Sequence, residues 1–395
     1  MDIYRGTASF TGKKTLRVRH ADGSFSEELT AVHIVIAAGA RPLVPAVEGL
    51  EDTGYLTYET FFDSDFPKTP WNSLLIIGGG AVAAEFAHIF SAMGTAVTMV
   101  QRNARLLPKE DEDISAFALT QFENNAITVL KNSQVVRAYS ENNEKHLVVR
   151  DNLSGEETDV RGEAILAAAG VQSNADLLRV DNAGIATDEH GWIQTDAYLQ
   201  TNVPGVWALG DINGKYQFRH KANYEAELWI HNFFSPKKEQ KEADYTKVPW
   251  AVFTHPQIAH LGMTERQAFE AEDRLLIGYN HYSSVAKGIA MGFREGAPDD
   301  GFVKIIADRH MKLLGVHIAG PEASVLIQPF VYLMNTTFAC REKETKKPRI
   351  LSRGGLACPR HGSFEPLFHS MVIHPSLSEL TAWAVGNMEW KEKPR

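Results

Sequence analysis

Apolar residues recur along the chain in short blocks whose spacing changes from one region to the next. In the first region, residues 15–19 and 31–37 read as strands separated by a turn. Residues 32–36 are apolar at nearly every position, a pattern typical of a strand buried on both faces of a parallel sheet. The first region therefore predicts part of a buried sheet.

A βαβ unit is predicted from residue 73. An apolar strand (74–77) leads into a glycine turn, then a helix (81–93) that ends at Gly94, then a second strand (96–100). A buried strand at 206–209 and a helix at 222–234 are expected further on. This alternation predicts an α/β fold.

The last third of the chain has a different pattern. From residue 248 the apolar runs read as antiparallel strands, and these runs cover residues 275–279, 302–307 and 313–318. Helices are expected from Glu322 and from Pro375. Residues 341–364 are charged and interrupted by proline and glycine, which predicts an exposed, inserted loop. This part therefore reads as an α+β domain.

Composition narrows the class of protein. The 395 residues carry a net charge of -9, which argues against nucleic acid or an anionic membrane as the main partner. The richest apolar run, 74–90, is too short to cross a bilayer, and the first residues have no apolar segment typical of a signal peptide. Two cysteines fit a reducing compartment. We expect a soluble, cytoplasmic protein.

The glycine turn is the first candidate site. Gly78-Gly79-Gly80-Ala81-Val82-Ala83 fits G-x-G-x-x-A between an apolar strand and a helix. Glycine permits close approach of the backbone to a pyrophosphate, and the helix N-terminus offers unpaired N–H groups. A structural turn is the alternative, but strand, turn, helix and second strand all lie within about 30 residues, as dinucleotide binding requires.

The end of the second strand bears on the choice between NAD and NADP. A carboxylate there would accept from the ribose 2′-hydroxyl, whereas an arginine would pair with a 2′-phosphate. This chain has Gln101-Arg102-Asn103-Ala104-Arg105, with two arginines and no carboxylate. The pattern favours NADP, with NAD as the alternative if the arginines are only a solvated surface.

Three other strand ends carry small residues or a carboxylate. Asp211 follows the strand at 206–209, at the edge where ligands bind in open α/β sheets, although it could merely cap the next helix. Ala38-Gly39 and Gly170 end two further strands, where the backbone can pass close to a cofactor.

His374 and Glu379 form a candidate acid–base pair. They are five residues apart with Pro375 between them, so the histidine would precede a helix and the glutamate would lie about one turn inside it. A carboxylate in that place orients an imidazole and raises its basicity. A helix cap with a packed histidine is the alternative.

The remaining cysteines and histidines give weaker signals. Cys340 and Cys358 flank the inserted loop, with His361 and His369 nearby, but no paired ligand spacing is present. We expect free thiols and no metal site. His255 and His281 are expected to be structural.

Together these segments resemble the pyridine nucleotide–disulfide oxidoreductase family, with mycothione reductase and dihydrolipoyl dehydrogenase as the most similar kinds of member. The resemblance covers nearly the whole chain. It is carried by residues 36–41 (IAAGAR), 78–85 (GGGAVAAE), 201–211 (TNVPGVWALGD), 252–265 (VFTHPQIAHLGMTE), 315–323 (GVHIAGPEA) and 374–379 (HPSLSE).

The resemblance implies a fold and a set of roles. The fold class is α/β, with Rossmann-like FAD and NAD(P) domains, the FAD domain incomplete, and a C-terminal α+β dimerisation domain. The implied domains are a partial FAD domain (1–70), an NAD(P) domain (71–170), a continuation of the FAD domain (171–247) and an interface domain (248–395).

The resemblance also places cofactors and partners. Asp211 would hold FAD through its ribityl–diphosphate part, with Ala38, Gly39, Gly170 and Ala222 near the cofactor. The glycine turn would hold NADP or NAD, with Glu85 near the contact of flavin and nicotinamide. His374, oriented by Glu379, would exchange protons with a redox thiol on the other subunit of a homodimer, and the substrate would be a small-molecule disulfide or a lipoyl group.

Two departures from the family pattern matter. Its members begin with a first G-x-G-x-x-G for the ADP half of FAD and a C-x-x-x-x-C redox pair, and neither occurs in these residues. We therefore expect an N-terminally truncated or split oxidoreductase that is inactive by itself. The alternatives are a non-catalytic dimeric remnant that binds nucleotide, and a flavin-dependent NAD(P)H oxidase or metal reductase.

Overall fold

The computed structural model describes residues 1–63, 65–335, 362–368 and 370–394. The chain forms two compact units, and each is made from separate stretches of sequence. The first unit combines residues 1–45 with 169–245, and the second combines residues 46–168 with 246–395. The bounds of the four domains expected from the sequence stay predictions.

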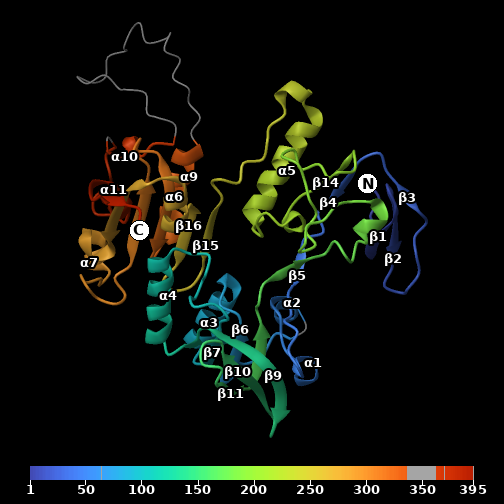
Figure 1. The fold of residues 1–395 in the computed structure, drawn as a ribbon, viewed down its shortest axis with the longest axis horizontal. Coiled ribbons are helices and arrows are strands. Elements are labelled where there is room, and N and C mark those ends of the chain that lie inside the picture. Colours follow the sequence, from blue (N-terminus) through green and yellow to red (C-terminus); the bar gives the residue numbers. More distant parts are fainter. Residues whose placement is uncertain (64, 336–361, 369, 395) are drawn as a thin grey trace. The chain divides into compact units, whose positions relative to one another are not determined.

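The first unit contains three small sheets and one long helix, α5 (Arg219–Phe234) (Figure 1). Helix α5 packs beside β14 through Trp207, Trp229 and Leu228. The sheets are antiparallel β1–β2–β3, antiparallel β5–β13 and parallel β4–β14. The strands are β1 (Thr7–Gly12), β2 (Thr15–Arg19), β3 (Leu29–Thr30), β4 (Ile34–Ile36), β5 (Ala40–Pro42), β13 (Val171–Ser173) and β14 (Val206–Ala208).

Strand β4 differs from its prediction in one respect. Ile34 and Ile36 are buried, but Val35 between them is 38% exposed and Val32 is 73% exposed. The expectation of burial on both faces is therefore wrong, because only the face with Ile34 and Ile36 joins the apolar core. The other face of β4 presents apolar side chains to solvent.

The second unit begins with a parallel sheet in the order β12–β6–β7–β8. Its strands are β6 (Ser73–Ile77), β7 (Ala96–Val100), β8 (Thr128–Leu130) and β12 (Ala164–Ala167), joined by helices α3 (Ala81–Ala92) and α4 (Glu112–Asn124). Helix α3 buries Ala83, Ala84, Ala87 and two phenylalanines, because these residues recur at helical spacing on one face. The predicted βαβ unit is confirmed.

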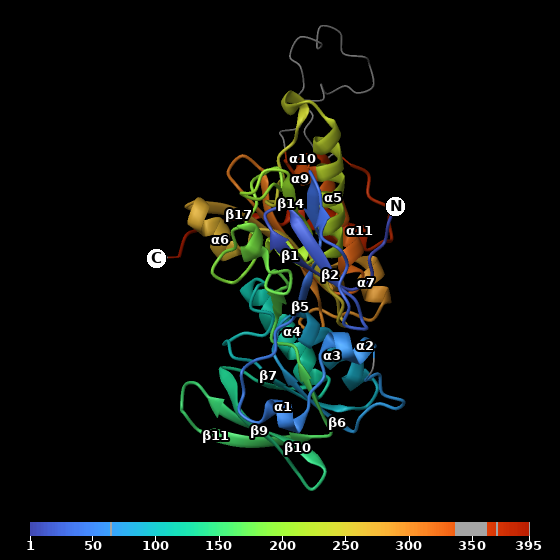
Figure 2. The same cartoon turned by 90° about the vertical axis from the view of Figure 1, so that its right-hand side faces the viewer.

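A three-stranded antiparallel sheet, β11–β10–β9, adjoins this parallel sheet (Figure 2). Its strands are β9 (Ser133–Glu141), β10 (Glu144–Asp151) and β11 (Glu157–Gly162). Two short helices, α1 (Leu50–Thr53) and α2 (Tyr58–Phe62), precede β6 in the sequence.

The rest of the second unit is built on a six-stranded antiparallel sheet, in the order β15–β16–β19–β18–β17–β20. The predicted strands are confirmed within it. Its strands are β15 (Pro249–Val252), β16 (Ile258–Gly262), β17 (Arg274–His281), β18 (Phe302–Ala307), β19 (Leu313–Ala319) and β20 (Glu389–Glu392). The helices of this part are α6 (Glu265–Ala271), α7 (Ala286–Ala290), α8 (Ala323–Leu326), α9 (Gln328–Asn335), α10 (Glu365–Phe368) and α11 (Ser378–Gly386).

Two details near the C-terminus correct the sequence predictions. Helix α11 begins at Ser378 and not at Pro375, so Glu379 lies in its first turn. Phe364 is 1% exposed and belongs to the core beside this sheet, so the end of the expected loop is buried because it is apolar. Most of that loop, with Cys340, Cys358, His361 and His369, lies outside the described residues.

The described residues contain no helix that is both long enough and apolar enough to cross a membrane.

Candidate functional site

The glycine turn lies between β6 and α3, as the sequence predicts. Gly78 has φ 135°, a value that side-chain-bearing residues rarely adopt, and its N–H donates to the carbonyl of Val100 at 2.9 Å. Gly80 caps α3, no side chain caps that end, and no acidic residue lies in the first turn. Open space surrounds Gly80 where a Cβ would project. The N–H groups of Ala81, Val82 and Ala83 at this end are thus suited to an anion.

The two candidates at the end of β7 differ in exposure. Gln101 is 5% exposed, and its amide donates to the carbonyl of Arg105 at 2.9 Å. Its side chain lies directly against Gly79, where a Cβ would come within 2.7 Å of it. Arg102 is exposed. Gln101 therefore packs against the glycine turn, whereas Arg102 is open to solvent.

Glu85 lies on α3, one turn after the glycines. Its Oε1 accepts the backbone N–H of Phe253 at 2.8 Å, and burial raises the pKa of its carboxyl group. A half-buried carboxyl group of this kind is typical of functional sites, although structural networks shift pKa values as well.

The Asp211 turn is in the first unit, at the end of β14. Gly210 precedes it with φ 76°, and Ala222 of α5 lies below, 3.7 Å from where a Gly210 Cβ would stand. Burial raises the pKa of Asp211, and the charge of Lys221 opposes that rise. The structure thus places two of the predicted residues, Asp211 and Ala222, next to the same turn.

Ala38, Gly39 and Gly170 lie in the same unit. Asn174 donates its amide to the carbonyl of Ala38 at 2.8 Å, and the carbonyl of Gly170 accepts the N–H of Leu43 at 2.9 Å. Space is open beside both glycines, so a Cβ would meet no atom within 4 Å. The two strand ends leave room for a ligand.

His374 and Glu379 are brought together, as predicted. Nδ1 of His374 lies 2.8 Å from Oε1 of Glu379, whose Oε2 accepts the N–H of Ser376 at 3.1 Å. The hydrogen bond from His374 lowers the pKa of Glu379. The Glu379 side chain is 3% exposed and that of His374 is 65% exposed. An ionised Glu379 keeps the proton on Nδ1, so Nε2 is the free base on the exposed side of the ring.

An open cavity of about 900 Å³ adjoins this pair. Its lining includes His374, Trp383 and the amide side chains of Asn280 and Asn387. A group brought to this surface could therefore meet the imidazole.

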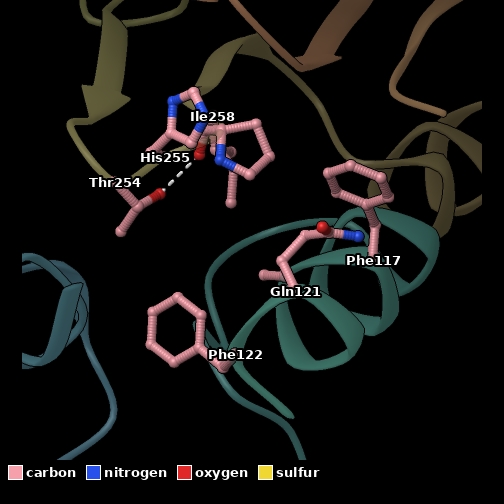
Figure 3. A pocket seen from close by; sticks show the side chains of 8 residues that line it. Phe117, Gln121, Phe122, Thr254, His255 and Ile258 are labelled. Carbon is pink, nitrogen blue, oxygen red and sulfur yellow. Dashed lines mark hydrogen bonds between the residues drawn. The ribbon is translucent and has the colours of Figure 1, made fainter. Parts of the chain in front are cut away.

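A second hollow is too narrow to admit a water molecule. Figure 3 shows Thr254, His255 and Ile258 facing Phe117 and Phe122 of α4 across it. His255 lines this narrow hollow, which offers no room for a ligand.

The comparisons with known proteins identify the family. A family model described as pyridine nucleotide-disulphide oxidoreductase matches residues 2–226. The chain belongs to this family. The dimerisation domain of the pyridine nucleotide-disulphide oxidoreductases matches residues 248–345.

Curated relatives agree with that membership. The chain is 32% identical to a dihydrolipoyl dehydrogenase of Rhizobium etli over 359 residues, covering 90% of this chain and 67% of the relative. It is 34% identical to a mycothione reductase of Mycobacterium tuberculosis over 345 residues, covering 85% of this chain and 71% of the relative.

A solved structure shares the fold. The Cu(II) complex of the HOCl-induced flavoprotein disulfide reductase RclA from Escherichia coli superposes with a TM-score of 0.80 at 24% identity, covering 96% of this chain and 78% of that one. The predicted α/β fold with a C-terminal dimerisation domain is confirmed.

Members of the pyridine nucleotide-disulphide oxidoreductase family are enzymes that bind FAD and use NAD(P)H. The residues of this chain fit both groups. The uncapped start of α3 and the open space at Gly80 suit a nucleotide pyrophosphate. The space is also open at Gly39 and Gly170, which lie in the same unit as the Asp211 turn.

Sequence reasoning missed a buried ionic network in the second unit of this oxidoreductase. The ammonium group of Lys304 lies 2.8 Å from Asp111, 3.0 Å from Asp113 and 2.8 Å from Glu265. Burial acts to lower the pKa of Lys304, but the carboxylates outweigh it and the net shift is upward. These residues are far apart in sequence, so no local pattern marks them.

Glu110, His260 and His317 form a second missed cluster, with ligand atoms within 4.8 Å of one another. Glu110 accepts a hydrogen bond from Trp250 at 2.6 Å and pairs with Nδ1 of His260 at 2.9 Å. Nε2 of His260 lies 3.0 Å from the carbonyl oxygen of Gly262, so both ring nitrogens of His260 have partners. Burial, with His260 nearby, lowers the pKa of His317 to about 4. The cluster is a polar network that connects the segment just before α4 to the antiparallel sheet.

Proposed function

We propose that this chain supplies the nicotinamide-binding and acid–base parts of an FAD-dependent NAD(P)H:disulfide oxidoreductase. The observation that carries the proposal is the His374–Glu379 pair, with a 2.8 Å hydrogen bond and an exposed imidazole. When bound, FAD would take a hydride from NAD(P)H and pass two electrons to a disulfide.

In this proposal His374 acts as the proton carrier. Glu379 holds the proton on Nδ1, which leaves Nε2 to accept a proton from a thiol and return it. A thiolate is the reactive form of cysteine, so a base beside a redox thiol assists both halves of thiol–disulfide exchange.

Nucleotide binding is assigned to the glycine turn. Gly78, Gly79, Gly80 and the first residues of α3 would hold the pyrophosphate, and Arg102 would pair with the 2′-phosphate of NADP. Glu85 would lie near the nicotinamide. FAD would be held by Asp211, with Ala38, Gly39, Gly170 and Ala222 beside it.

The substrate and the partner are also proposals. The relatives are named for dihydrolipoyl and mycothione substrates, which supports a small-molecule disulfide or a lipoyl group here. The dimerisation-domain match over residues 248–345 supports a homodimer, which we place at residues 248–395. In that homodimer His374 would serve the redox thiol of the other subunit.

The redox thiols themselves must come from outside these 395 residues. The two cysteines present, Cys340 and Cys358, do not form a C-x-x-x-x-C pair. A base without a proton donor within reach cannot assist the reaction. The 395 residues alone should therefore not reduce disulfides.

The test compares the 395 residues alone with an enzyme completed by a segment that carries G-x-G-x-x-G and C-x-x-x-x-C. NADPH-dependent turnover of lipoamide and of thiol disulfides is measured in both. We expect turnover in the completed enzyme only, and a loss of roughly 10²–10⁴-fold in its His374→Ala variant. His190→Ala, which removes an exposed histidine of the first unit, is the control. Robust disulfide reduction by the 395 residues, or an unaffected His374→Ala enzyme, would refute the proposal.

A further inference from the structure

A buried ion pair lies under the Asp211 turn, and neither of its residues was singled out as a site residue. Lys221 and Glu225 are one turn apart on α5, with Nζ and Oε1 separated by 3.0 Å. Lys221 is 2% exposed and Glu225 is 0% exposed. Taking two charges out of water is unfavourable unless each finds close partners, so their contacts decide what the pair does.

Both backbone groups of Gly210 are bound by this pair. The N–H of Gly210 donates to Oε2 of Glu225 at 2.7 Å, and Nζ of Lys221 donates to the carbonyl of Gly210 at 2.9 Å. Gly210 has φ 76° and directly precedes Asp211. The two peptide groups that flank Gly210, the second of which leads into Asp211, are thus held by opposite charges.

The other side of the turn is held by the same two side chains. Nζ of Lys221 donates to Oδ1 of Asn213 at 2.6 Å, and the amide of Asn213 donates to Oε1 of Glu225 at 2.8 Å. The hydroxyl of Tyr245 also donates to Glu225. Asp211 therefore lies between two residues, Gly210 and Asn213, that are both anchored to one ion pair.

Stability alone does not explain a buried ion pair, because well-packed apolar residues often stabilise a protein as much. Charged groups that each make several hydrogen bonds have a stricter geometry than apolar side chains. The contacts of Lys221 and Glu225 converge on the turn and not on the rest of α5. This convergence indicates a role in positioning.

We propose that Lys221 and Glu225 are positioning residues that hold the carboxylate of Asp211 in place for the ribityl–diphosphate part of FAD. The proposal rests on the role of Asp211 in the proposed function. The two charges act oppositely on the pKa of Asp211, which burial raises on balance: Lys221 lowers it and Glu225 raises it, so the positioning role depends on the hydrogen bonds to the turn.

The experiment uses the 395-residue protein and three measurements: the Kd for FAD by calorimetry, the unfolding midpoint, and amide hydrogen exchange of residues 206–214 without ligand. Lys221→Met removes the ammonium group and leaves Glu225 with an unpaired buried charge. Lys221→Met/Glu225→Gln removes both charges but keeps an oxygen that can accept from Gly210. Lys215→Met, at an exposed position close to the turn, is the control.

We expect Lys221→Met to lower the midpoint, speed exchange at 206–214 and weaken FAD binding by about tenfold or more, the scale of one misplaced charge-assisted hydrogen bond. In the double variant the midpoint should recover, because no buried charge is left unpaired, while FAD binding stays weak and exchange stays fast. Lys215→Met should change none of the three. Recovery of FAD affinity together with the midpoint, or unchanged exchange at 206–214, would overturn the positioning role.

An Asp211→Asn variant distinguishes failure of the positioning role from failure of the proposed function. If the Asp211→Asn protein binds FAD as tightly as the wild type, the assignment of Asp211 is wrong and the positioning role fails with it. If Asp211→Asn weakens binding and the double variant does not, only the positioning role is refuted.

Discussion

Arg102 and Arg105 follow the same strand, β7, but their surroundings differ. Arg105 pairs with Glu112 at 3.0 Å, whereas Arg102 is exposed. A 2′-phosphate offers Arg102 a charge-assisted contact that a ribose hydroxyl does not. We therefore propose that Arg102 decides the choice of nicotinamide cofactor.

The prediction is that NADPH binds more tightly than NADH, and that Arg102→Ala removes the difference. The loss for NADPH should be about tenfold to a hundredfold, the worth of one hydrogen bond to a charged group. Calorimetric titration of the 395-residue protein with both nucleotides measures it. Arg105→Ala is the matched control, since its guanidinium group already has a partner. Equal affinities for the two nucleotides, or an Arg102→Ala protein that binds NADPH as before, would contradict it.

At the scale of secondary-structure elements, Lys304 joins β18 to the start of α4 and to α6. Asp111 caps α4, and Glu265 is the first residue of α6. Glu265 also pairs with the exposed Lys391 of β20. One buried ammonium group thus connects elements that are remote in sequence, whereas Lys391 meets a single carboxylate at the surface.

We predict that Lys304→Met lowers the free energy of unfolding by about 3–5 kcal/mol, because it leaves the buried carboxylate of Asp111 without its ammonium partner. Lys391→Met should cost only about 0–1 kcal/mol, as exposed pairs do. Urea unfolding of both variants checks the contrast. If the two variants lost similar amounts of unfolding free energy, the burial of Lys304 would not contribute to stability and the prediction would be wrong.

The effect of Lys304→Met should depend on pH. The pKa of Asp111 is below its usual value, because the charges around it outweigh burial. The contribution of Asp111 to the free energy of unfolding is therefore present above about pH 4 and is lost as pH falls through the lowered pKa. The pKa of Lys304 is raised, so its contribution is complete below about pH 10 and is lost at higher pH. The difference in unfolding free energy between wild type and Lys304→Met should therefore be largest between these limits. A difference that grows in acid would contradict this.

Gly278 of β17 controls how closely α11 approaches the sheet. A Cβ at this glycine would lie 2.2 Å from the carbonyl oxygen of Ala384 in α11. Gly278→Ala should push α11 outward and destabilise the protein by about 1–3 kcal/mol, as overpacking does. Because α11 presents Glu379, the same change should slow disulfide turnover in the completed enzyme. Gly386→Ala, at the end of α11 with no atom near its Cβ, is the control for thermal unfolding and turnover.

Local patterns predicted the parts of the site that depend on neighbours in sequence. The glycine turn, the Asp211 turn and the His374–Glu379 pair each occupy a few consecutive residues, so spacing made them candidates, and the family resemblance gave them their expected roles. The networks around Lys304 and Glu110 were missed because their members come from strands and helices far apart in the chain. The Lys221–Glu225 spacing was visible in the sequence, but it is also the spacing of an ordinary surface pair.

At the scale of the whole molecule, the first unit presents an apolar strand face. Val32 and Val35 are exposed on and beside β4, and β4 pairs with β14 in a two-stranded sheet. A cofactor held at the ends of so small a sheet has few strands to support it. We predict that the 395 residues bind FAD weakly. Purification followed by gel filtration and a flavin absorption spectrum tests this, and FAD retained at one molecule per chain would contradict it.

The discontinuity of the first unit has a consequence for synthesis on the ribosome. Strand β4 can pair only after β14 has been made, and the whole of residues 46–168 is translated in between. The strands β6, β7, β8 and β12 all lie within that stretch, so their sheet can form as soon as it has emerged. Strand β4 must wait, with Ile34 and Ile36 unprotected, and this long-range pairing is slow to form. The nascent chain should therefore depend on a chaperone most while residues 169–208 are being translated.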